Sequence, residues 1–391
     1  MDAFTFHNPT KIVFGKDCVA QLEQDFGKNT VKNVLLTYGG GSIKRNGIYD
    51  DVMAQLKAAG KNVIELSGIM SNPRTEKVQE GADLCREHKI DFILAVGGGS
   101  VIDCSKFIAA VAKTEPGYDW WEHMFMKREN VTDALPFGVV LTMSATGSEM
   151  NNRGVVTNWE SQKKMGGYGD ALFPQFSYLD PVYTYSMPHN QMINGICDML
   201  SHLMEQYFSL PETNNLSDAL IEAAFKNIMA NAAVAIKNPE DYEARSNLMW
   251  GATLALNGIM GLGKNRIGWP IRLNMRCPLF TTFRMVRASP LYIQCYFVIF
   301  TKIIYLVLFA LLKMYGVSAK TNTPTKPPWP WPVSMRCALI SNPSGLPQLL
   351  PKWVFRLKRC LRLLKNLTDI RHPIPTLRRK IFWRFIRARY D

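Results

Sequence analysis

The segment NGICDMLSHLMEQYF places a carboxylate and an imidazole four residues apart, at Asp198 and His202. In a helix, residues at i and i+4 lie on one face, one turn apart. A carboxylate and an imidazole so placed can chelate a divalent metal, which needs further ligands from elsewhere in the chain. An intrahelical Asp–His pair without a metal accounts for the same spacing. The two residues are therefore candidate metal ligands and candidate catalytic residues.

Two identical glycine runs follow apolar stretches of the chain. Gly39-Gly40-Gly41-Ser42 follows NVLLTY, and Gly97-Gly98-Gly99-Ser100 follows DFILAV. Glycine lets a backbone approach a ligand closely and offer its N–H groups to an anion, especially where a strand turns into a helix. A plain turn is the alternative for either run alone. We expect the helix after the second run to bring Asp103 and Lys106 near a phosphate-binding loop.

The first run continues into two cations, Lys44 and Arg45. A preference for the non-phosphorylated dinucleotide usually needs a carboxylate on the adenosine ribose, whereas cations there suit a 2′-phosphate. The pattern favours NADP(H), with a solvated helix start as the alternative.

The segment LTMSATGSEMN is dense in small hydroxyl residues. Such residues after a strand can hydrogen-bond a ribose or an amide, and they are also ordinary loop residues. They are Thr142, Ser144, Thr146 and Ser148.

The elements that must position these residues follow an alternating pattern. Apolar strands are expected at 33–38, 61–66, 91–96 and 136–141, and helices at 49–59 and 74–88. This alternation predicts a parallel sheet covered on both faces. After Pro181 helical patterns take over, at 190–208, 217–237 and 241–260. We predict an α/β domain at 1–180, followed by an all-helical domain that begins at 181–265.

The charge balance changes abruptly at Asn265. Residues 1–265 carry 23 Lys+Arg and 30 Asp+Glu, a balance of −7, whereas residues 266–391 carry 23 and 2, a balance of +21, with no Glu. Ordinary domains contain both signs at roughly a quarter of their residues. The last third is therefore unlike a natural soluble domain.

Bulk features narrow the protein class. The eight Cys residues form no CxxC pair, which fits a reducing, cytoplasmic compartment, and the N-terminus lacks a secretory signal pattern. The run 291–312 has the length of a membrane span, and the basic sequence after it could contact membrane or nucleic acid. The non-enzyme alternative is an inactive chimeric protein whose basic, apolar tail binds membrane or nucleic acid non-specifically. In the main interpretation the protein binds neither membrane nor nucleic acid.

Taken together, the motifs of residues 1–265 resemble the iron-containing alcohol dehydrogenases, in the branch of the bacterial butanol dehydrogenases and NADPH-dependent aldehyde reductases. In chain order they are PTKIVFGK, YGGGSIKRNG, GIMSNPR, AVGGGSVIDCSKFIA, LTMSATGSEMN, LDP, NGICDMLSHLMEQYF and LNGIMGLGKN. The resemblance implies an active site between a Rossmann-like and a helical domain. It also implies hydride transfer between NADP(H) and a primary alcohol or aldehyde, and a homo-oligomer. A sister family on the same fold, such as the glycerol dehydrogenases, is the enzyme alternative.

The resemblance further implies residue roles. Asp198 and His202 would be two of four ligands to one Fe²⁺ or Zn²⁺, which acts as a Lewis acid. The adenosine side would be held by Gly39, Gly40 and Ser42, the pyrophosphate by Gly97, Gly98, Gly99, Ser100 and Asp103, and the nicotinamide end by Thr142, Ser144, Thr146 and Asn151, with Lys164 nearby.

The chain departs from the family where the other two ligands, both His, are expected. The family pattern resembles DWxxHxIEHALSAxYDIPHGAGLA, but residues 266–290 read RIGWPIRLNMRCPLFTTFRMVRASP, and no His occurs between His202 and His372. One permitted coding of this stretch, read from the third base of its first codon, gives DWLAHSIEHALSALYDIPHGAGLA. We therefore predict a frameshift at or just after Asn265, an aberrant tail at 266–391, exposed apolar helix faces before it, and a chain that is inactive or nearly so.

Overall fold

The structure is a computed structural model that describes residues 1–27, 30–207, 209 and 215–264. Its centre is a six-stranded sheet with the order β1-β8-β5-β4-β2-β3, and every neighbouring pair of strands is parallel. The strands are β1 (Lys11–Phe14), β2 (Asn33–Tyr38), β3 (Asn62–Leu66), β4 (Phe92–Gly97), β5 (Phe137–Leu141) and β8 (Phe176–Leu179).

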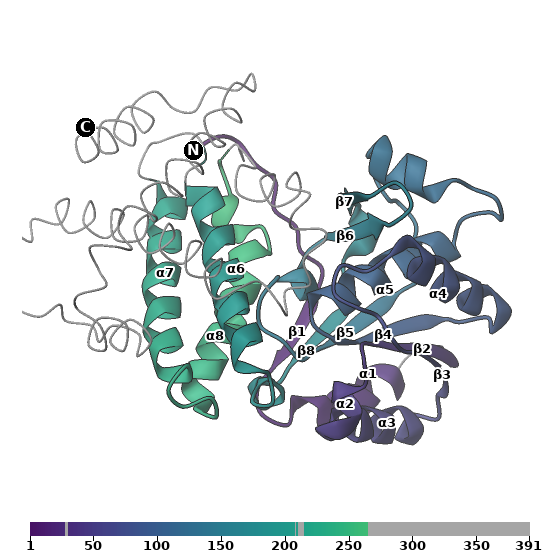
Figure 1. The fold of residues 1–391 in the computed structure, drawn as a ribbon, viewed down its shortest axis with the longest axis horizontal. Helices are drawn as coiled ribbons and strands as arrows, with labels where there is room; N and C mark the ends of the chain where they lie inside the picture. The colour runs from purple at the N-terminus through teal and green to yellow at the C-terminus, as the bar shows by residue number, and fades with distance from the viewer. Residues whose placement is uncertain (28–29, 208, 210–214, 265–391) are drawn as a thin grey trace, which may run out of the picture. The chain divides into compact units, whose positions relative to one another are not determined.

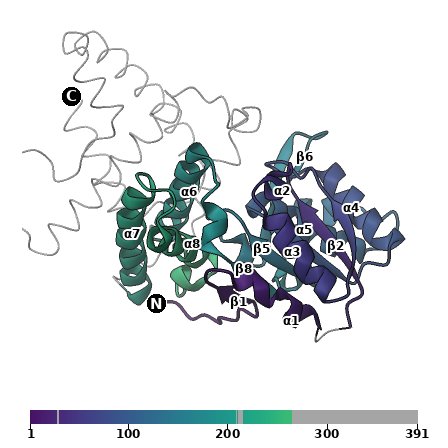
Figure 2. The same cartoon turned by 90° about the horizontal axis from the view of Figure 1, so that it is seen from below.

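Helices cover both faces of this sheet, as its apolar strands require. The helices α1 (Leu22–Gly27), α2 (Ser42–Arg45) and α3 (Ile48–Ala58) lie on one face, and α4 (Thr75–Glu87) and α5 (Gly99–Ala112) lie on the other (Figure 1). Seen from below, α3 lies in front of the sheet (Figure 2). Successive residues of β4 point to opposite faces of the sheet. Phe92 packs in the core under α1 and α3, and Ile93 packs in the core under α4 and α5.

The strand order changes direction between β2 and β4. After β2 the chain adds β3 on one side, and it then returns to add β4 on the other side of β2. Tyr38 of β2 and Val96 of β4 are register partners, so the glycine runs that follow them lie next to each other. Open α/β sheets bind ligands in the crevice at the carboxyl ends of the strands, at such a switch point.

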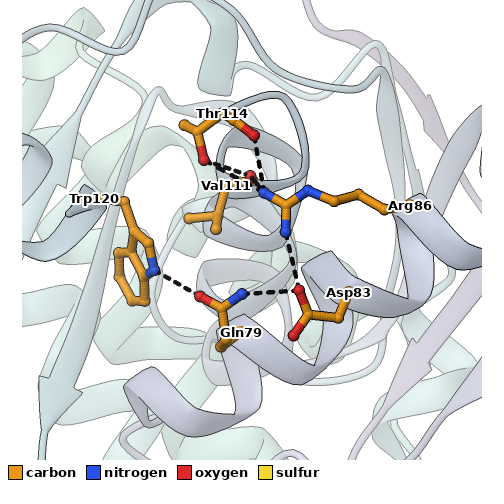
Figure 3. Close-up of polar contacts among 6 residues, drawn as sticks. All are labelled: Gln79, Asp83, Arg86, Val111, Thr114 and Trp120. Carbon is orange, nitrogen blue, oxygen red and sulfur yellow. Dashed lines mark hydrogen bonds and ion pairs between the residues drawn. The ribbon is translucent and has the colours of Figure 1, made fainter. Parts of the chain in front are cut away.

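Arg86 of α4 fixes the far end of α5. Its guanidinium donates to the carbonyl oxygens of Val111 at 2.5 Å and Thr114 at 3.0 Å, and to the carboxylate of Asp83 at 2.9 Å. Figure 3 shows that the network continues through Gln79 to the indole of Trp120. A cation at the C-terminus of a helix interacts favourably with its last carbonyls and with the negative end of its dipole.

A hairpin and three long helices complete the described part of the chain. The hairpin consists of β6 (Arg153–Asn158) and β7 (Lys163–Tyr168), and the helices are α6 (His189–Tyr207), α7 (Leu216–Ala235) and α8 (Tyr242–Leu256). Asn215 and Asp241 cap α7 and α8 by accepting from the backbone N–H groups of Asp218 and Ala244. Short helical turns are η1 (Cys18–Gln21), η2 (Trp121–Met126), η3 (Ser148–Met150), η4 (Asp170–Leu172), η5 (Pro181–Thr184) and η6 (Ile259–Gly261).

The fold class predicted from the sequence is confirmed. The four expected strands appear within one residue of their predicted bounds, whereas β1, β8 and the β6–β7 hairpin were not predicted. The expected boundary at 180/181 falls between β8 and η5. No helix in the described residues is long and apolar enough to cross a bilayer. The candidate span at 291–312 and the proposed aberrant tail at 266–391 lie outside the described residues.

Candidate active site

The second glycine run forms a tight start to α5. A Cβ on Gly97 would lie 2.6 Å from the side chain of Val101, and a Cβ on Gly99 would lie 2.3 Å from Oγ1 of Thr146. Only glycine fits these two positions. Gly98, the N-cap residue, offers no side chain to the first turn, and Ser100 is half-buried beside it. The unpaired N–H groups and the positive dipole end of this 14-residue helix suit an anion.

The first glycine run is more open. The carbonyl of Gly39 accepts from the N–H of Gly68 at 3.0 Å, which folds the loop after β3 against it, while a Cβ on Gly40 would meet nothing within 4 Å. Ser42 and Lys44 are exposed at the start of α2. The run therefore borders the crevice with exposed backbone.

Lys44 has a partner that the sequence did not reveal. Its Nζ lies 3.0 Å from Oε2 of Glu65, near the end of β3. The hydroxyls of Tyr38 and Tyr49 donate to the same carboxylate at 2.5 Å and 2.6 Å. Burial raises the pKa of Glu65, but the three hydrogen bonds together lower it below its usual value. Lys44 is thus one half of an ion pair, contrary to the free cation expected from the sequence.

The β5–β6 loop, residues 142–151, packs against the glycine loop of α5. The N–H of Thr142 donates to the carbonyl of Gly97 at 3.1 Å, and Thr146 lies against Gly99. Oγ of Ser148 donates to the carboxylate of Asp103 at 2.6 Å. The hydroxyl-rich segment predicted at the nicotinamide end therefore lies at the glycine end of α5.

Asp103 and Lys106 hold this loop and do not face an anion. Asp103 also accepts from the N–H of Val155 at 2.9 Å. Lys106 is fully buried, and its ammonium donates to the backbone and side-chain oxygens of Asn151 at 2.7 and 3.0 Å and to the carbonyl of Arg153 at 2.7 Å. Burial lowers the pKa of Lys106 to about 7. These three hydrogen bonds hold the Lys106 ammonium against Asn151 and the start of β6.

The same loop reaches the helical region. Oγ1 of Thr253 in α8 donates to the buried carboxylate of Glu149 at 2.5 Å, and burial raises the pKa of that carboxylate. A Cβ on Gly195 of α6 would lie 2.4 Å from the carbonyl oxygen of Ser144. The loop that contacts the glycine end of α5 therefore also contacts α6, one turn before Asp198.

Asp198 and His202 lie together on α6, as the spacing predicted. Their Oδ1 and Nε2 atoms are 3.7 Å apart. Two ligands at tetrahedral angles around one Zn²⁺ would be about 3.4 Å apart, given bonds of about 2.1 Å. The imidazole is buried, and its Nδ1 has no hydrogen-bond partner among the described residues. The pair fits a divalent metal, although the described residues contain no group of three or more candidate ligands.

Lys164 of β7 is half-buried and contacts the loop before α4. Its Nζ donates to Oδ1 of Asn72 at 2.7 Å, and Asn72 has a left-handed backbone with φ 57°. Burial lowers the pKa of Lys164, and the charges of Asp103 and Asp198 oppose that shift.

Two family models match the chain in sequence order. The description "Iron-containing alcohol dehydrogenase" covers residues 9–181, and "Fe-containing alcohol dehydrogenase family, C-terminal" covers residues 192–293, of which the last part lies outside the described residues.

Individual relatives agree with these models. A probable NADH-dependent butanol dehydrogenase 2 of Bacillus subtilis is 49% identical over 263 residues, and the NADPH-dependent aldehyde reductase YqhD of Escherichia coli is 41% identical over 263 residues. The matches span 67% of this chain and 66% and 67% of those proteins. The crystal structure of an NADH-dependent butanol dehydrogenase A from Thermotoga maritima superposes with a TM-score of 0.65, at 41% identity, over 68% of this chain and 66% of that one. The chain belongs to the iron-containing alcohol dehydrogenase family.

Proposed function

We propose that this site transfers a hydride between a nicotinamide dinucleotide and a primary alcohol or aldehyde. One observation carries the proposal: the β5–β6 loop touches the glycine end of α5 through Thr146 and touches α6 through Ser144. A coenzyme bound at α5 and a substrate at Asp198 and His202 would therefore share one cavity wall. Hydride transfer requires this proximity.

Each candidate residue then has a role. The backbone of Gly97, Gly98, Gly99 and Ser100 binds the pyrophosphate, and Asp103 keeps the β5–β6 loop against them. Thr142, Ser144, Thr146, Asn151 and Lys164 surround the nicotinamide end. Asp198 and His202 hold a divalent metal, Fe²⁺ or Zn²⁺, which when bound polarises the substrate oxygen as a Lewis acid.

The coenzyme is the finer part of the proposal. The Bacillus subtilis relative is named NADH-dependent and the Escherichia coli relative NADPH-dependent. Lys44 and Arg45 at the adenosine side support the binding of NADP(H) by this chain in addition to NAD(H). Assembly as a homo-oligomer and a cytoplasmic location are further proposals, drawn from the family resemblance.

We also propose that residues 266–391 are an out-of-frame reading and that the chain as it stands is impaired. The family's expected His ligands are absent from residues 266–290, and one permitted coding of that stretch encodes them in the alternative frame. Two ligands do not complete a catalytic metal site, which usually has three protein ligands or more.

Sequencing the coding DNA across Gly261 to Pro290 tests the frame directly. We expect one base too few in the current reading, so that a one-base insertion restores the family pattern. The restored protein should oxidise NADPH in the presence of an aldehyde and Fe²⁺ or Zn²⁺. A restored frame whose product binds coenzyme and metal but reduces no aldehyde would contradict the proposed activity.

A further inference from the structure

We propose that Glu65 sets the coenzyme choice of this enzyme, because it balances the charge of Lys44 at the adenosine end of the crevice. The pair makes a site that accepts both NADH and NADPH without strong preference. This inference rests on the proposed function and adds a specificity-determining residue to it.

The sheet order determines which end of the coenzyme meets Lys44 and Glu65. The β5–β6 loop, which reaches Asp198 and His202 through α6, follows β5, on one side of the switch point. Lys44 follows the end of β2 and Glu65 is the penultimate residue of β3, both on the other side. With the pyrophosphate at α5 and the nicotinamide toward α6, the adenosine ribose extends toward β2 and β3.

Both charged groups are within reach of a ligand there. The side chains of Lys44 and Glu65 are 45% and 35% exposed, so neither is sealed in the interior. Lys44 also lies 4.3 Å from the ring centroid of Tyr49 and 5.1 Å from that of Tyr38. The two tyrosine hydroxyls fix the carboxylate, and the rings fix the ammonium, so the charges stay adjacent.

The two charges act on the 2′ position of the ribose in opposite ways. A carboxylate accepts a hydrogen bond from a ribose 2′-hydroxyl and repels a 2′-phosphate, whereas a nearby cation attracts the phosphate. The sequence shows the cations Lys44 and Arg45 after the first glycine run, but not that the carboxylate of Glu65 folds onto Lys44. In the structure the carboxylate of Glu65 opposes the charge of Lys44, so the preference of the site for a 2′-phosphate over a 2′-hydroxyl is smaller than the cations alone would give.

The test is a titration of the full chain with NADH and with NADPH, in which protein fluorescence reports binding. We expect the two dissociation constants of the wild type to agree within about threefold. Glu65→Gln keeps an acceptor for Tyr38 and Tyr49 but removes the charge. It should raise the ratio of the NADH to the NADPH dissociation constant by about fivefold to tenfold, because the 2′-phosphate is no longer repelled. Solvent screening keeps this effect smaller than that of a buried charge. Lys44→Met should shift the ratio toward NADH by a similar factor.

Asp133→Asn is the matched control. It removes one negative charge from an exposed ion pair with Lys113, at the far end of α5. It should leave the ratio unchanged, and circular dichroism of all variants checks that they fold.

The outcomes separate the two proposals. Binding of neither dinucleotide by the folded wild type overturns the proposed function and the inference with it. Binding of both, with a ratio that neither Glu65→Gln nor Lys44→Met changes, overturns the inference alone. A wild-type preference above about tenfold in either direction also overturns the charge-balanced site.

Discussion

The sheet region and the helical region differ in how completely they bury their apolar surface. The strands of the sheet are covered on both faces, and β2, β4 and β5 are buried almost throughout. On α7 one face is buried through Ile221 and Ile228, whereas Leu216, Leu220 and Val234 on the opposite face are 66%, 39% and 43% exposed. An apolar face of this kind marks a missing or separate packing partner. Exposed apolar helix faces before Asn265 are what the frameshift hypothesis predicts.

The chemistry of the two regions differs in the same way. The proposed coenzyme site is built from elements of the described sheet region, and both of its glycine runs lie within the described residues. The metal-candidate pair on α6 has two ligands, and no third His, Cys, Asp or Glu joins it within the described residues. We infer that coenzyme binding survives in the chain as it stands, whereas turnover depends on residues that the correct frame would supply.

The largest effect is expected at the metal pair. In the frame-restored protein, His202→Ala removes a buried ligand and should lower both metal content and kcat, the latter by about 10³-fold. NADPH affinity should change little. Metal analysis and aldehyde-dependent NADPH oxidation measure these effects. His189→Ala, an exposed His on the same helix, is the control. Full metal content in His202→Ala would remove this residue from the ligand set.

A smaller effect is expected where the two regions join. Thr253→Val leaves the buried carboxylate of Glu149 without its hydroxyl donor and should lower the free energy of unfolding by about 1–3 kcal/mol. Thr157→Val is the matched control, because Oγ1 of Thr157 is also buried but has no hydrogen-bond partner among the described residues. That change should alter stability by no more than about 0.5 kcal/mol. Equal losses in urea unfolding of the two variants would mean that the Glu149 contact does not join the regions.

The smallest effect on stability is expected on the exposed face of α7. Leu216→Gln with Leu220→Gln should change the unfolding free energy by less than about 0.5 kcal/mol while lowering the binding of a hydrophobic dye. Ile221→Gln, on the buried face of the same helix, should cost about 3 kcal/mol or more. A comparable loss in the double variant would show that the α7 face is covered in solution.

Local pattern predicted the elements that position the site but not their long-range contacts. β2 and β4 were predictable because each is an apolar run that ends in glycine. The β7 strand was not, because Gly166 and Gly167 weaken its strand signal; a Cβ on Gly167 would lie 2.7 Å from Phe107. The Asp198–His202 pair follows from helical spacing alone.

Contacts between distant residues required the structure. The Lys44–Glu65 pair joins residues from two elements, and the Glu149–Thr253 contact spans 104 positions. Lys106 was expected near the glycine loop because it follows the glycine run on the same helix. Its burial toward Asn151 depends on the path of the β5–β6 loop, which the sequence does not reveal.

The central claim is that the chain as it stands retains the coenzyme site and lacks a working metal site. Titration with NADPH and assay of aldehyde reduction, on this chain and on the frame-restored protein with the same metal, test it most directly. We predict NADPH dissociation constants within about threefold of each other and turnover by the restored protein alone. Aldehyde reduction by the chain as it stands, or loss of its NADPH binding while folded, would contradict the claim.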